Sequence, residues 1–180
     1  MPTRGQTAVV VPVPVADRLL QEVASSHSQA VRQGVAAHVS LLYPFLDASV
    51  VDDEVLGWLR EFAARTRPIA VEFLDVVPAP GFVHLPVPAL RPLVAGLRAR
   101  WPQVVPYGGR FGADPAPHVT LAMGLAADDG AAVAARVRRF LPLTSSADHV
   151  WIVAYDEGWS LVETFPLRGA DGEPESPGRQ

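Results

Sequence analysis

Two short stretches of this chain carry a histidine and a hydroxyl in the same order: His38-Val39-Ser40-Leu41 and His118-Val119-Thr120-Leu121. Polar and apolar residues alternate in both stretches, which predicts β-strands with one buried face. Side chains two residues apart point to the same face of a strand, so each histidine lies beside the hydroxyl of its own stretch while the valine and leucine face the core. An imidazole next to a hydroxyl can bind an anion, and two such strands in one small domain indicate a matched pair.

Hydrophobic periodicity and turn residues predict the elements that position these strands. The expected strands cover residues 7–13, 36–43, 68–77, 82–87, 117–123, 148–156 and 159–167. Two expected helices cover residues 16–26 and 89–101. A third is opened by a capping box from Ser49 to Asp52 and ends near Arg65, and a fourth is capped by Asp128 and ends near Leu141.

The predicted elements repeat in order, because each half reads strand, helix, His strand, helix, strand, and such a repeat favours internal duplication. The predicted fold class is therefore α+β, with duplicated β-α-β-α-β halves related by a pseudo-two-fold axis and antiparallel-rich sheets flanking a central cleft. We expect a single domain over residues 1–168, with lobes of roughly 7–77 and 81–167. The tail, 169–180, is polar and rich in proline and glycine, which predicts disorder.

Composition excludes several classes of protein. The net charge is −4, so the chain lacks the positive field of a strong duplex binder. It contains no lysine and no cysteine, so every fixed cation is an arginine, and disulfides, thiolate chemistry and cysteine metal sites are excluded. No apolar run approaches the ~18 residues of a membrane span, and the N-terminus lacks the layout of a secretory signal. We expect a cytoplasmic protein that does not act in a membrane.

The paired motifs resemble those of the 2H phosphoesterase superfamily, which includes proteins called 2′-5′ RNA ligases and 2′,3′-cyclic nucleotide phosphodiesterases. The signature of that family is two copies of His-x-Ser/Thr-apolar in a duplicated α+β domain. The continuation Leu41-Leu42-Tyr43-Pro44-Phe45 is also similar to family members, and the resemblance covers roughly residues 7–168. It implies an RNA-processing hydrolase that opens cyclic phosphates and leaves the phosphate at the 2′ position.

The residue types fit that chemistry. Hydrolysis of a cyclic phosphodiester needs a base that takes a proton from water and an acid that gives one to the leaving ribose oxygen. Because the unperturbed pKa of histidine is about 6.5, one of His38 and His118 can be neutral and the other protonated near neutral pH. Ser40 and Thr120 can donate hydrogen bonds to the non-bridging oxygens, where charge grows in the transition state. The scheme requires no metal ion and no cofactor, and it leaves open which histidine is the acid.

Three further residues are predicted to bind substrate. His84 alternates with Phe82 on a strand, so it can line the cleft or be a structural histidine. Phe45 follows the first motif and can stack on a base or pack in the core. Arg110 lies in the loop 102–116 and can contact a phosphate or remain a solvated arginine.

We expect a monomeric cyclic phosphodiesterase whose partner is a cyclic-phosphate nucleotide or an RNA 3′ end. Two alternatives stay open. The same site can join RNA ends by 2′-5′ ligation, although long RNA usually needs a larger basic surface. The chain can also be a non-catalytic nucleotide- or RNA-binding module, because family members often carry a basic residue after the second motif, where this chain has Leu121-Ala122-Met123-Gly124.

Overall fold

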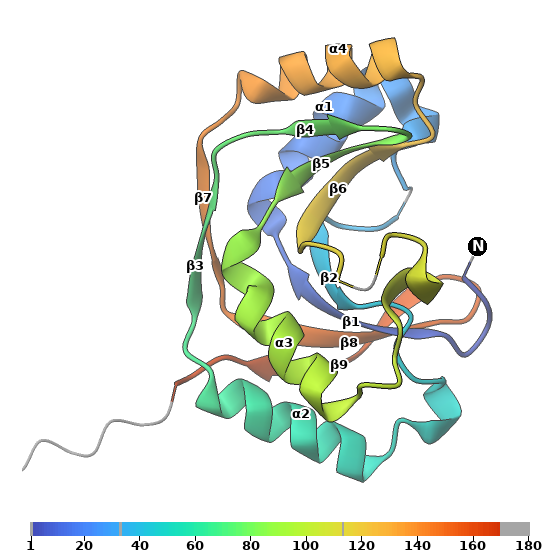
Figure 1. The fold of residues 1–180 in the computed structure, drawn as a ribbon, viewed down its shortest axis with the longest axis vertical. Helices are drawn as coiled ribbons and strands as arrows, with labels where there is room; N and C mark the ends of the chain where they lie inside the picture. The colour runs from blue at the N-terminus through green and yellow to red at the C-terminus, as the bar shows by residue number, and fades with distance from the viewer. Residues whose placement is uncertain (1, 33, 113, 170–180) are drawn as a thin grey trace, which may run out of the picture.

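The computed structural model describes residues 2–32, 34–112 and 114–169 and has an α+β architecture (Figure 1). One sheet has the strand order β4-β5-β6-β2-β1-β8-β9, and a separate ribbon is formed by β3 and β7. All of these strand pairs are antiparallel, and the predicted fold class is confirmed. The strands are β1 (Thr7–Pro12), β2 (His38–Leu42), β3 (Ile69–Phe73), β4 (Val77–Ala79), β5 (Phe82–Pro86), β6 (His118–Met123), β7 (Leu143–Ala147), β8 (His149–Tyr155) and β9 (Trp159–Pro166). The helices are α1 (Asp17–His27), α2 (Asp53–Arg65), α3 (Arg91–Arg100) and α4 (Ala127–Arg138).

The two His strands, β2 and β6, are neighbours at the centre of the sheet, where Val39 pairs with Val119. Each His strand also pairs with the first strand of its own half, β2 with β1 and β6 with β5. The next strand outward comes from the opposite half of the chain. In the first half β1 pairs with β8 of the second half, and in the second half β5 pairs with β4 of the first half. This order fits the predicted pseudo-two-fold axis between β2 and β6. A common origin of the halves and their lobe boundaries stay predictions.

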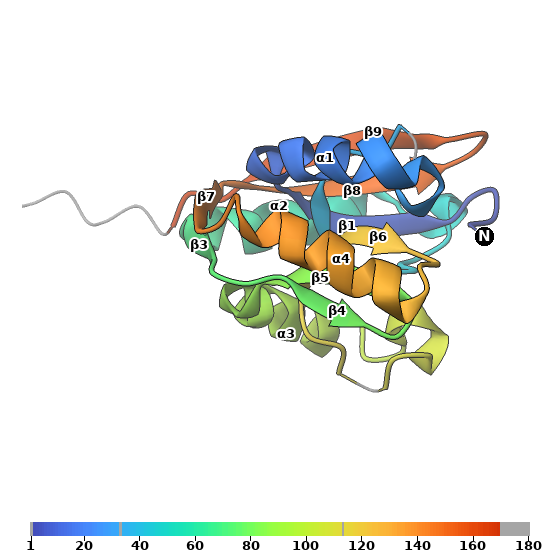
Figure 2. The same cartoon turned by 90° about the horizontal axis from the view of Figure 1, so that it is seen from above.

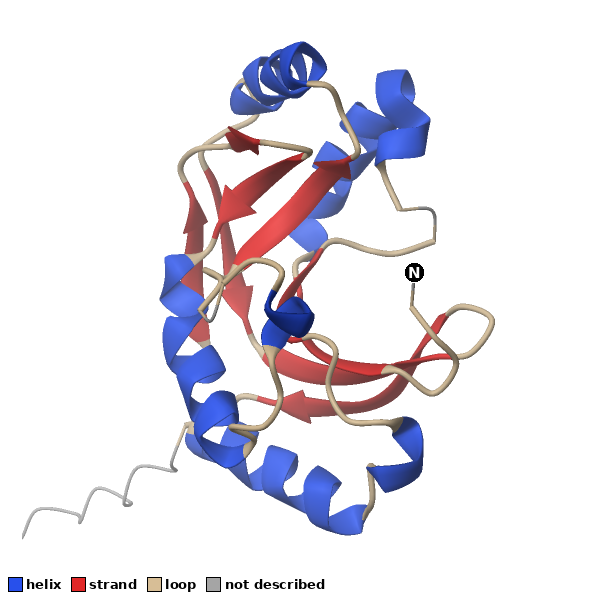
Figure 3. Cartoon of the chain, turned by 45° about the vertical axis from the view of Figure 1, so that its right-hand side comes forward, coloured by secondary structure: helices blue, strands red, loops and turns tan. Residues whose placement is uncertain are grey.

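The sheet bends at its centre, so that β4, β5 and β6 form one arm and β1, β8 and β9 form the other (Figure 3). Helices cover the outside of both arms. α1 and α4 lie side by side at one end of the molecule, and α2 lies along β9 at the other (Figures 1 and 2). α3 packs against β2. The strand residues that alternate with the core residues point their side chains to the inner side of the bend.

One face of the sheet builds the hydrophobic core. On the central strands every second residue is at most 3% exposed, including Val9, Val39, Leu41, Val119 and Leu121. Burial of each such side chain contributes roughly 1.5–3 kcal/mol, which fixes the strands firmly. The opposite side chains, among them the motif histidines and hydroxyls, are therefore presented from a rigid base.

The start of α2 differs from the prediction. Its cap is Asp52, whose carboxylate accepts hydrogen bonds from the N–H groups of Glu54 at 3.1 Å and Val55 at 3.0 Å. The predicted capping box at Ser49 is wrong, because Ser49 lies in a separate 3-10 turn that is capped by Asp47. The helix still ends at Arg65, as predicted.

Both ends of α4 also differ. Ala126 is the cap, and Asp128 lies in the first turn, where its negative charge favours the helix N-terminus without a capping bond. The helix ends at Arg138 and does not reach Leu141. Pro142 follows Leu141 and disfavours a helical conformation of the residue before it.

The predicted strand 68–77 is two strands. β3 ends at Phe73, and the chain then turns at Asp75, whose carboxylate accepts a hydrogen bond from the N–H of Val76 at 2.7 Å. After the turn β4 leaves the ribbon and joins the main sheet. Periodicity does not predict β7, because Thr144-Ser145-Ser146 interrupts its apolar alternation; it forms because it pairs with β3 along its whole length.

The predicted disordered tail covers 169–180, and everything after Gly169 lies outside the described residues. Among the helices that the structure describes, none is long and apolar enough to cross a lipid bilayer. The longest, α2, has 13 residues, and a spanning helix needs about 20.

Candidate active site

The centre of the sheet brings the four motif residues together on one face. The strands run antiparallel from their central valine pair, so His38 lies opposite Thr120 and Ser40 lies opposite His118. All four side chains are part-exposed, while the valines behind them are fully buried. Each histidine therefore lies beside the hydroxyl of the other strand as well as that of its own.

Each of the two imidazoles is held by a hydrogen bond of the same kind, to the backbone carbonyl two residues earlier. Nδ1 of His38 lies 2.8 Å from the carbonyl oxygen of Ala36, and Nδ1 of His118 lies 2.8 Å from that of Ala116. A carbonyl can only accept, so Nδ1 carries the proton in both rings. Nε2 of each ring takes no part in this bond, so it can accept a proton when the ring is neutral and donate one when it is charged.

The backbone before each histidine is fixed in the same way. The N–H of Val13 donates to the carbonyl of Ala37, and the N–H of Val87 donates to the carbonyl of Pro117, both at 2.8 Å. The N–H of Ala37 is satisfied by the carboxylate of Asp17 at 2.7 Å. Proline at position 117 has no N–H to satisfy, so the second half reaches the same geometry without such a carboxylate.

These residues lie in a cleft of about 870 Å³, within the size range of small-molecule sites, roughly 300–1,000 Å³. Its walls come from both arms of the sheet and from the loops before β2 and β6. Among the described residues that line it there is no aspartate or glutamate, whereas Arg32, Arg110 and three histidines line it. In a chain of net charge −4, the cleft is a local positive region that suits an anionic ligand.

The surroundings shift two of these histidines toward the neutral form. Burial lowers the pKa of His38, its hydrogen bond to Ala36 opposes this, and the positive charges of Arg32 and His118 lower the pKa further. Burial and the charge of His118 lower the pKa of His84 to about 4. Near pH 7 both rings therefore favour the form that accepts a proton.

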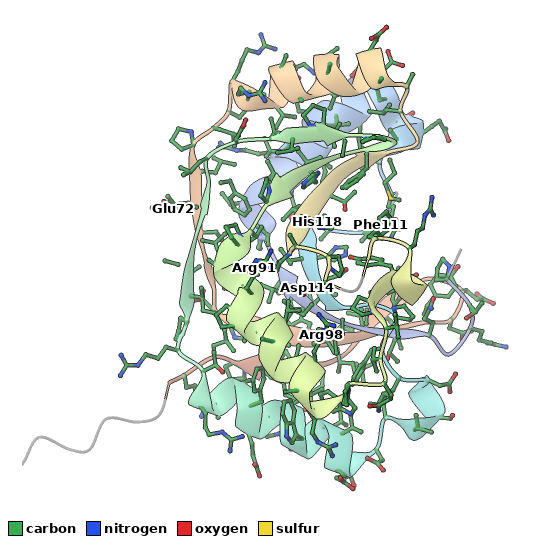
Figure 4. The ribbon with its side chains drawn as sticks, viewed as in Figure 1. Glu72, Arg91, Arg98, Phe111, Asp114 and His118 are labelled. Carbon is green, nitrogen blue, oxygen red and sulfur yellow. The ribbon has the colours of Figure 1, made fainter. Side chains whose placement is uncertain are left out.

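A row of aromatic rings extends from His118 along the cleft wall. His84 lies edge to face with His118 at a centroid distance of 5.2 Å and stacks on Phe82 at 4.7 Å. Phe111 follows at 6.2 Å from Phe82, and Tyr107 lies 5.2 Å from Phe111. Figure 4 shows Phe111 and His118 facing the same central space. The row continues through Tyr43 and Trp159. Such rings can stack on a nucleobase.

The structure places two of the three predicted substrate-binding residues in the cleft. His84 lines it, and its Nδ1 is buried without a hydrogen-bond partner among the described residues. Arg110 lines it with its guanidinium 5.5 Å from the centre of the Phe111 ring. Phe45 does not line it, because its side chain is 8% exposed and packs edge to face on Trp101 at 4.9 Å. The interpretation of Phe45 as a base-stacking residue is therefore wrong, and it belongs to the core.

Two further cleft residues, Arg32 and Tyr107, lie on loops, which carry no hydrophobic periodicity. The guanidinium of Arg32, before β2, donates from Nη2 to the sulfur of Met123 at the end of β6, at 3.6 Å. The N–H of Tyr107, before β6, donates to the carbonyl of Tyr43 just past β2, at 2.6 Å. Tyr107 has a left-handed φ of 53°, and its side chain is hydrogen-bonded to Ser40. Each loop thus crosses to the end of the other His strand.

The family model of the 2′-5′ RNA ligase superfamily matches residues 11–159, a range that includes both His strands. The chain belongs to the 2′-5′ RNA ligase superfamily. Solved structures show that this superfamily member shares its fold with distant proteins. TT0787 of Thermus thermophilus is 17% identical, with a TM-score of 0.63 over 91% of this chain and 98% of that chain.

E. coli LigT was solved in complexes with ATP and with 3′-AMP, and both structures resemble this superfamily member. Their identities are 12% and 15% and their TM-scores 0.56 and 0.52, each over 92% of this chain and 99% of that chain. A comparison with curated protein sequences finds no match. Membership of the 2′-5′ RNA ligase superfamily supports an enzyme that processes phosphoesters.

Proposed function

We propose that this protein is a cyclic phosphodiesterase that opens the 2′,3′-cyclic phosphate of a nucleotide or an RNA end and leaves a 2′-phosphate. The observation that carries the proposal is the matched pair of His38 and His118, each with Nδ1 held on a carbonyl and Nε2 free, in a cleft without a lining carboxylate among the described residues. Superfamily membership supports the chemistry. The nucleotides held by E. coli LigT support a nucleotide ligand.

The proposed reaction moves two protons. One imidazole accepts a proton at Nε2 from the attacking water as the water oxygen bonds to phosphorus. The bond from phosphorus to the 3′ oxygen breaks, and the other imidazole donates its Nε2 proton to that oxygen, which becomes the 3′ hydroxyl. The phosphate stays on the 2′ oxygen, and proton exchange with solvent resets both rings. The scheme needs no metal ion and no cofactor.

The neighbouring polar groups stabilise the transition state. Ser40 and Thr120 lie beside the histidines and donate hydrogen bonds to the non-bridging oxygens as their negative charge grows. The base stacks on the aromatic row, next to His84. Arg110, on the loop above that row, contributes positive charge toward an anionic substrate.

The test is hydrolysis of 2′,3′-cyclic nucleotides with EDTA present, for the wild type and for His38→Ala and His118→Ala. We expect turnover in the chelator and a loss of about 10²–10⁴-fold in each variant, the range for removing a general acid or base. His149→Ala is the matched control, because this exposed histidine lies on β8 and does not line the cleft.

Other outcomes separate the alternatives. Unchanged turnover in both histidine variants contradicts the proposal. Saturable nucleotide binding by folded wild-type protein without product supports a binding module instead. In the alternative ligation an RNA 5′ hydroxyl replaces water: its oxygen bonds to phosphorus, the bond from phosphorus to the 3′ oxygen breaks, and a 2′-5′ diester remains. This reaction is assayed with the same three proteins, and it requires the same two histidines.

A further inference from the structure

Arg32 places an uncompensated positive charge at the cleft. Eight other arginines pair with carboxylates, and within the described residues Arg32 forms no such pair. It is exposed, and its guanidinium instead donates to the sulfur of Met123 at 3.6 Å. A thioether is a weak acceptor. The guanidinium can therefore exchange this contact for the oxygens of a phosphate, which it binds far more strongly.

The contact between Arg32 and Met123 joins the two halves of the site. Arg32 precedes the strand that carries His38, whereas Met123 ends the strand that carries His118. Met123 also pairs with Phe82 in the sheet register, and Arg32, Phe82 and Met123 all line the cleft. A phosphate held between the two imidazoles, with its base on the aromatic row, lies within reach of this long side chain.

Arg32 also acts on the reacting groups. Burial is the main cause of the lowered pKa of His38, and the positive charge of Arg32 adds to it. The second cleft arginine, Arg110, has no part in this shift and lies over the ring of Phe111. Of the two cleft arginines, Arg32 is therefore the one whose charge reaches His38.

The groups around His38 come from three segments. Arg32 belongs to the loop before β2, and His118 belongs to β6. Tyr107, which is hydrogen-bonded to Ser40, belongs to the loop before β6. The charge of Arg32 and that of His118 both oppose protonation of His38. No carboxylate among the described lining residues counters these two charges, and only the hydrogen bond to the Ala36 carbonyl opposes them.

We propose that Arg32 binds the phosphate of the substrate and makes His38 the proton acceptor of the pair. The inference rests on the proposed phosphodiesterase function. The planar guanidinium takes two non-bridging oxygens of the phosphate. The proton of the attacking water then goes to Nε2 of His38, and the leaving 3′ oxygen takes its proton from Nε2 of His118.

The experiment compares Arg32→Gln, which removes the charge, with Arg32→Lys, which keeps the charge but loses the planar fork. Arg18→Gln is the matched control, because Arg18 is an exposed arginine on α1, in the same half, and does not line the cleft. Two quantities are measured for each protein. They are kcat and KM for a 2′,3′-cyclic nucleotide across pH, and the affinity for a nucleoside 2′-monophosphate.

For Arg32→Gln we expect a loss of roughly 10- to 100-fold in kcat/KM, the effect of one charge-assisted hydrogen bond. The acidic limb of its kcat/KM profile moves to higher pH, because a cation beside His38 is gone. Arg32→Lys restores the position of that limb without restoring the affinity for the 2′-monophosphate. Arg18→Gln behaves as the wild type.

Wild-type kcat/KM and an unmoved acidic limb in Arg32→Gln overturn this inference, while the histidine variants still decide the phosphodiesterase function separately. If the wild type shows no turnover, the proposed function fails and the titration decides the phosphate-binding role of Arg32. Unchanged affinity for the 2′-monophosphate in Arg32→Gln then overturns that role, and a loss of about tenfold supports it.

Discussion

At the scale of single residues, His38 and His118 share a tautomer, and each lies between two hydroxyls, its own and that of the facing strand. A hydroxyl that donates to a non-bridging oxygen acts mainly in the transition state. We therefore expect Ser40→Ala and Thr120→Ala each to lower kcat by about 10²-fold with a smaller change in KM. Steady-state kinetics measures this, and Thr120→Ser, which keeps the hydroxyl, serves as the control. A kcat near that of the wild type in both alanine variants contradicts the assigned role.

His84 has a second consequence, for stability. Its pKa falls from 6.5 to about 4 in the folded protein, so the native state binds fewer protons than the unfolded chain between these values. The stability linked to His84 is complete above about pH 6.5 and is lost as pH falls toward 4. The full shift would correspond to about 3 kcal/mol, and solvent screening of the part-exposed ring reduces it to about 1–2 kcal/mol.

His84→Phe tests this linkage, because phenylalanine cannot be protonated and leaves no buried ring nitrogen. We expect the free energy of unfolding to fall less in His84→Phe than in the wild type between pH 7 and pH 4.5, by about 1–2 kcal/mol. Urea titrations at the two pH values measure the difference. Other titrating groups are common to both proteins and cancel, so equal pH dependence in the two proteins would falsify the linkage.

At the scale of elements, the loop before β6 is held in place from outside the cleft. The carboxylate of Asp114 pairs with two arginines of α3, Arg91 at 3.2 Å and Arg98 at 2.8 Å, as Figure 4 shows. The same loop carries Tyr107 and Phe111 into the aromatic row. These ion pairs are part-exposed, so their value for stability is small, about 0–1 kcal/mol. We therefore assign these ion pairs the role of fixing the position of the loop before β6.

We therefore expect Asp114→Asn to raise KM for a cyclic nucleotide several-fold, while the free energy of unfolding changes by less than about 1 kcal/mol. Kinetics and urea titration of the same protein separate the two effects. Glu54→Gln is the matched control, because the Glu54–Arg100 ion pair of 3.1 Å joins α2 to α3 away from the cleft. An unchanged KM in Asp114→Asn, or an equal rise of KM in both variants, would mean that the ion pairs of Asp114 do not hold the loop for substrate binding.

The sequence predicts the helices and strands whose local hydrophobic periodicity identifies them. Strict alternation around His38 and His118 locates both His strands to within two residues, and the repeated order of elements anticipates their pairing. β7 escapes such reasoning because its polar Thr144–Ser146 segment is a strand only through its partner β3. Local pattern cannot distinguish a core aromatic from a cleft aromatic either, and for this reason Phe45 was misplaced.

The site residues that the sequence does not predict are held by contacts between distant segments. Arg32 meets Met123, 91 positions away in the chain, and nothing in its own neighbourhood marks it. Tyr107 has a left-handed backbone and donates its N–H to the carbonyl of Tyr43 in the other half. Loops carry no period, so only the packed structure shows which of their side chains reach the cleft.

At the scale of the whole molecule, one chain supplies both His strands and both loops that cross between them, so we propose that the monomer is the active species. Charge is unevenly distributed over it. The net charge is −4, yet the described cleft lining holds two arginines and no carboxylate. Two arginines at the end of α4 are engaged elsewhere, since Arg136 pairs with Glu22 and Arg138 pairs with Asp75.

This distribution predicts a weak salt dependence for RNA-end binding. Each phosphate neutralised on a single strand contributes a slope of about −0.7 to log K against log salt concentration, so two cleft arginines give about −1.4. Anisotropy of an oligonucleotide with a 3′-terminal cyclic phosphate, measured on His118→Ala to prevent turnover, tests this. Arg110→Gln should reduce the slope to about −0.7, and Arg139→Gln, on the exposed end of α4, should leave it unchanged. A slope steeper than about −3 would require a phosphate-binding surface beyond the cleft and would favour long RNA as the substrate.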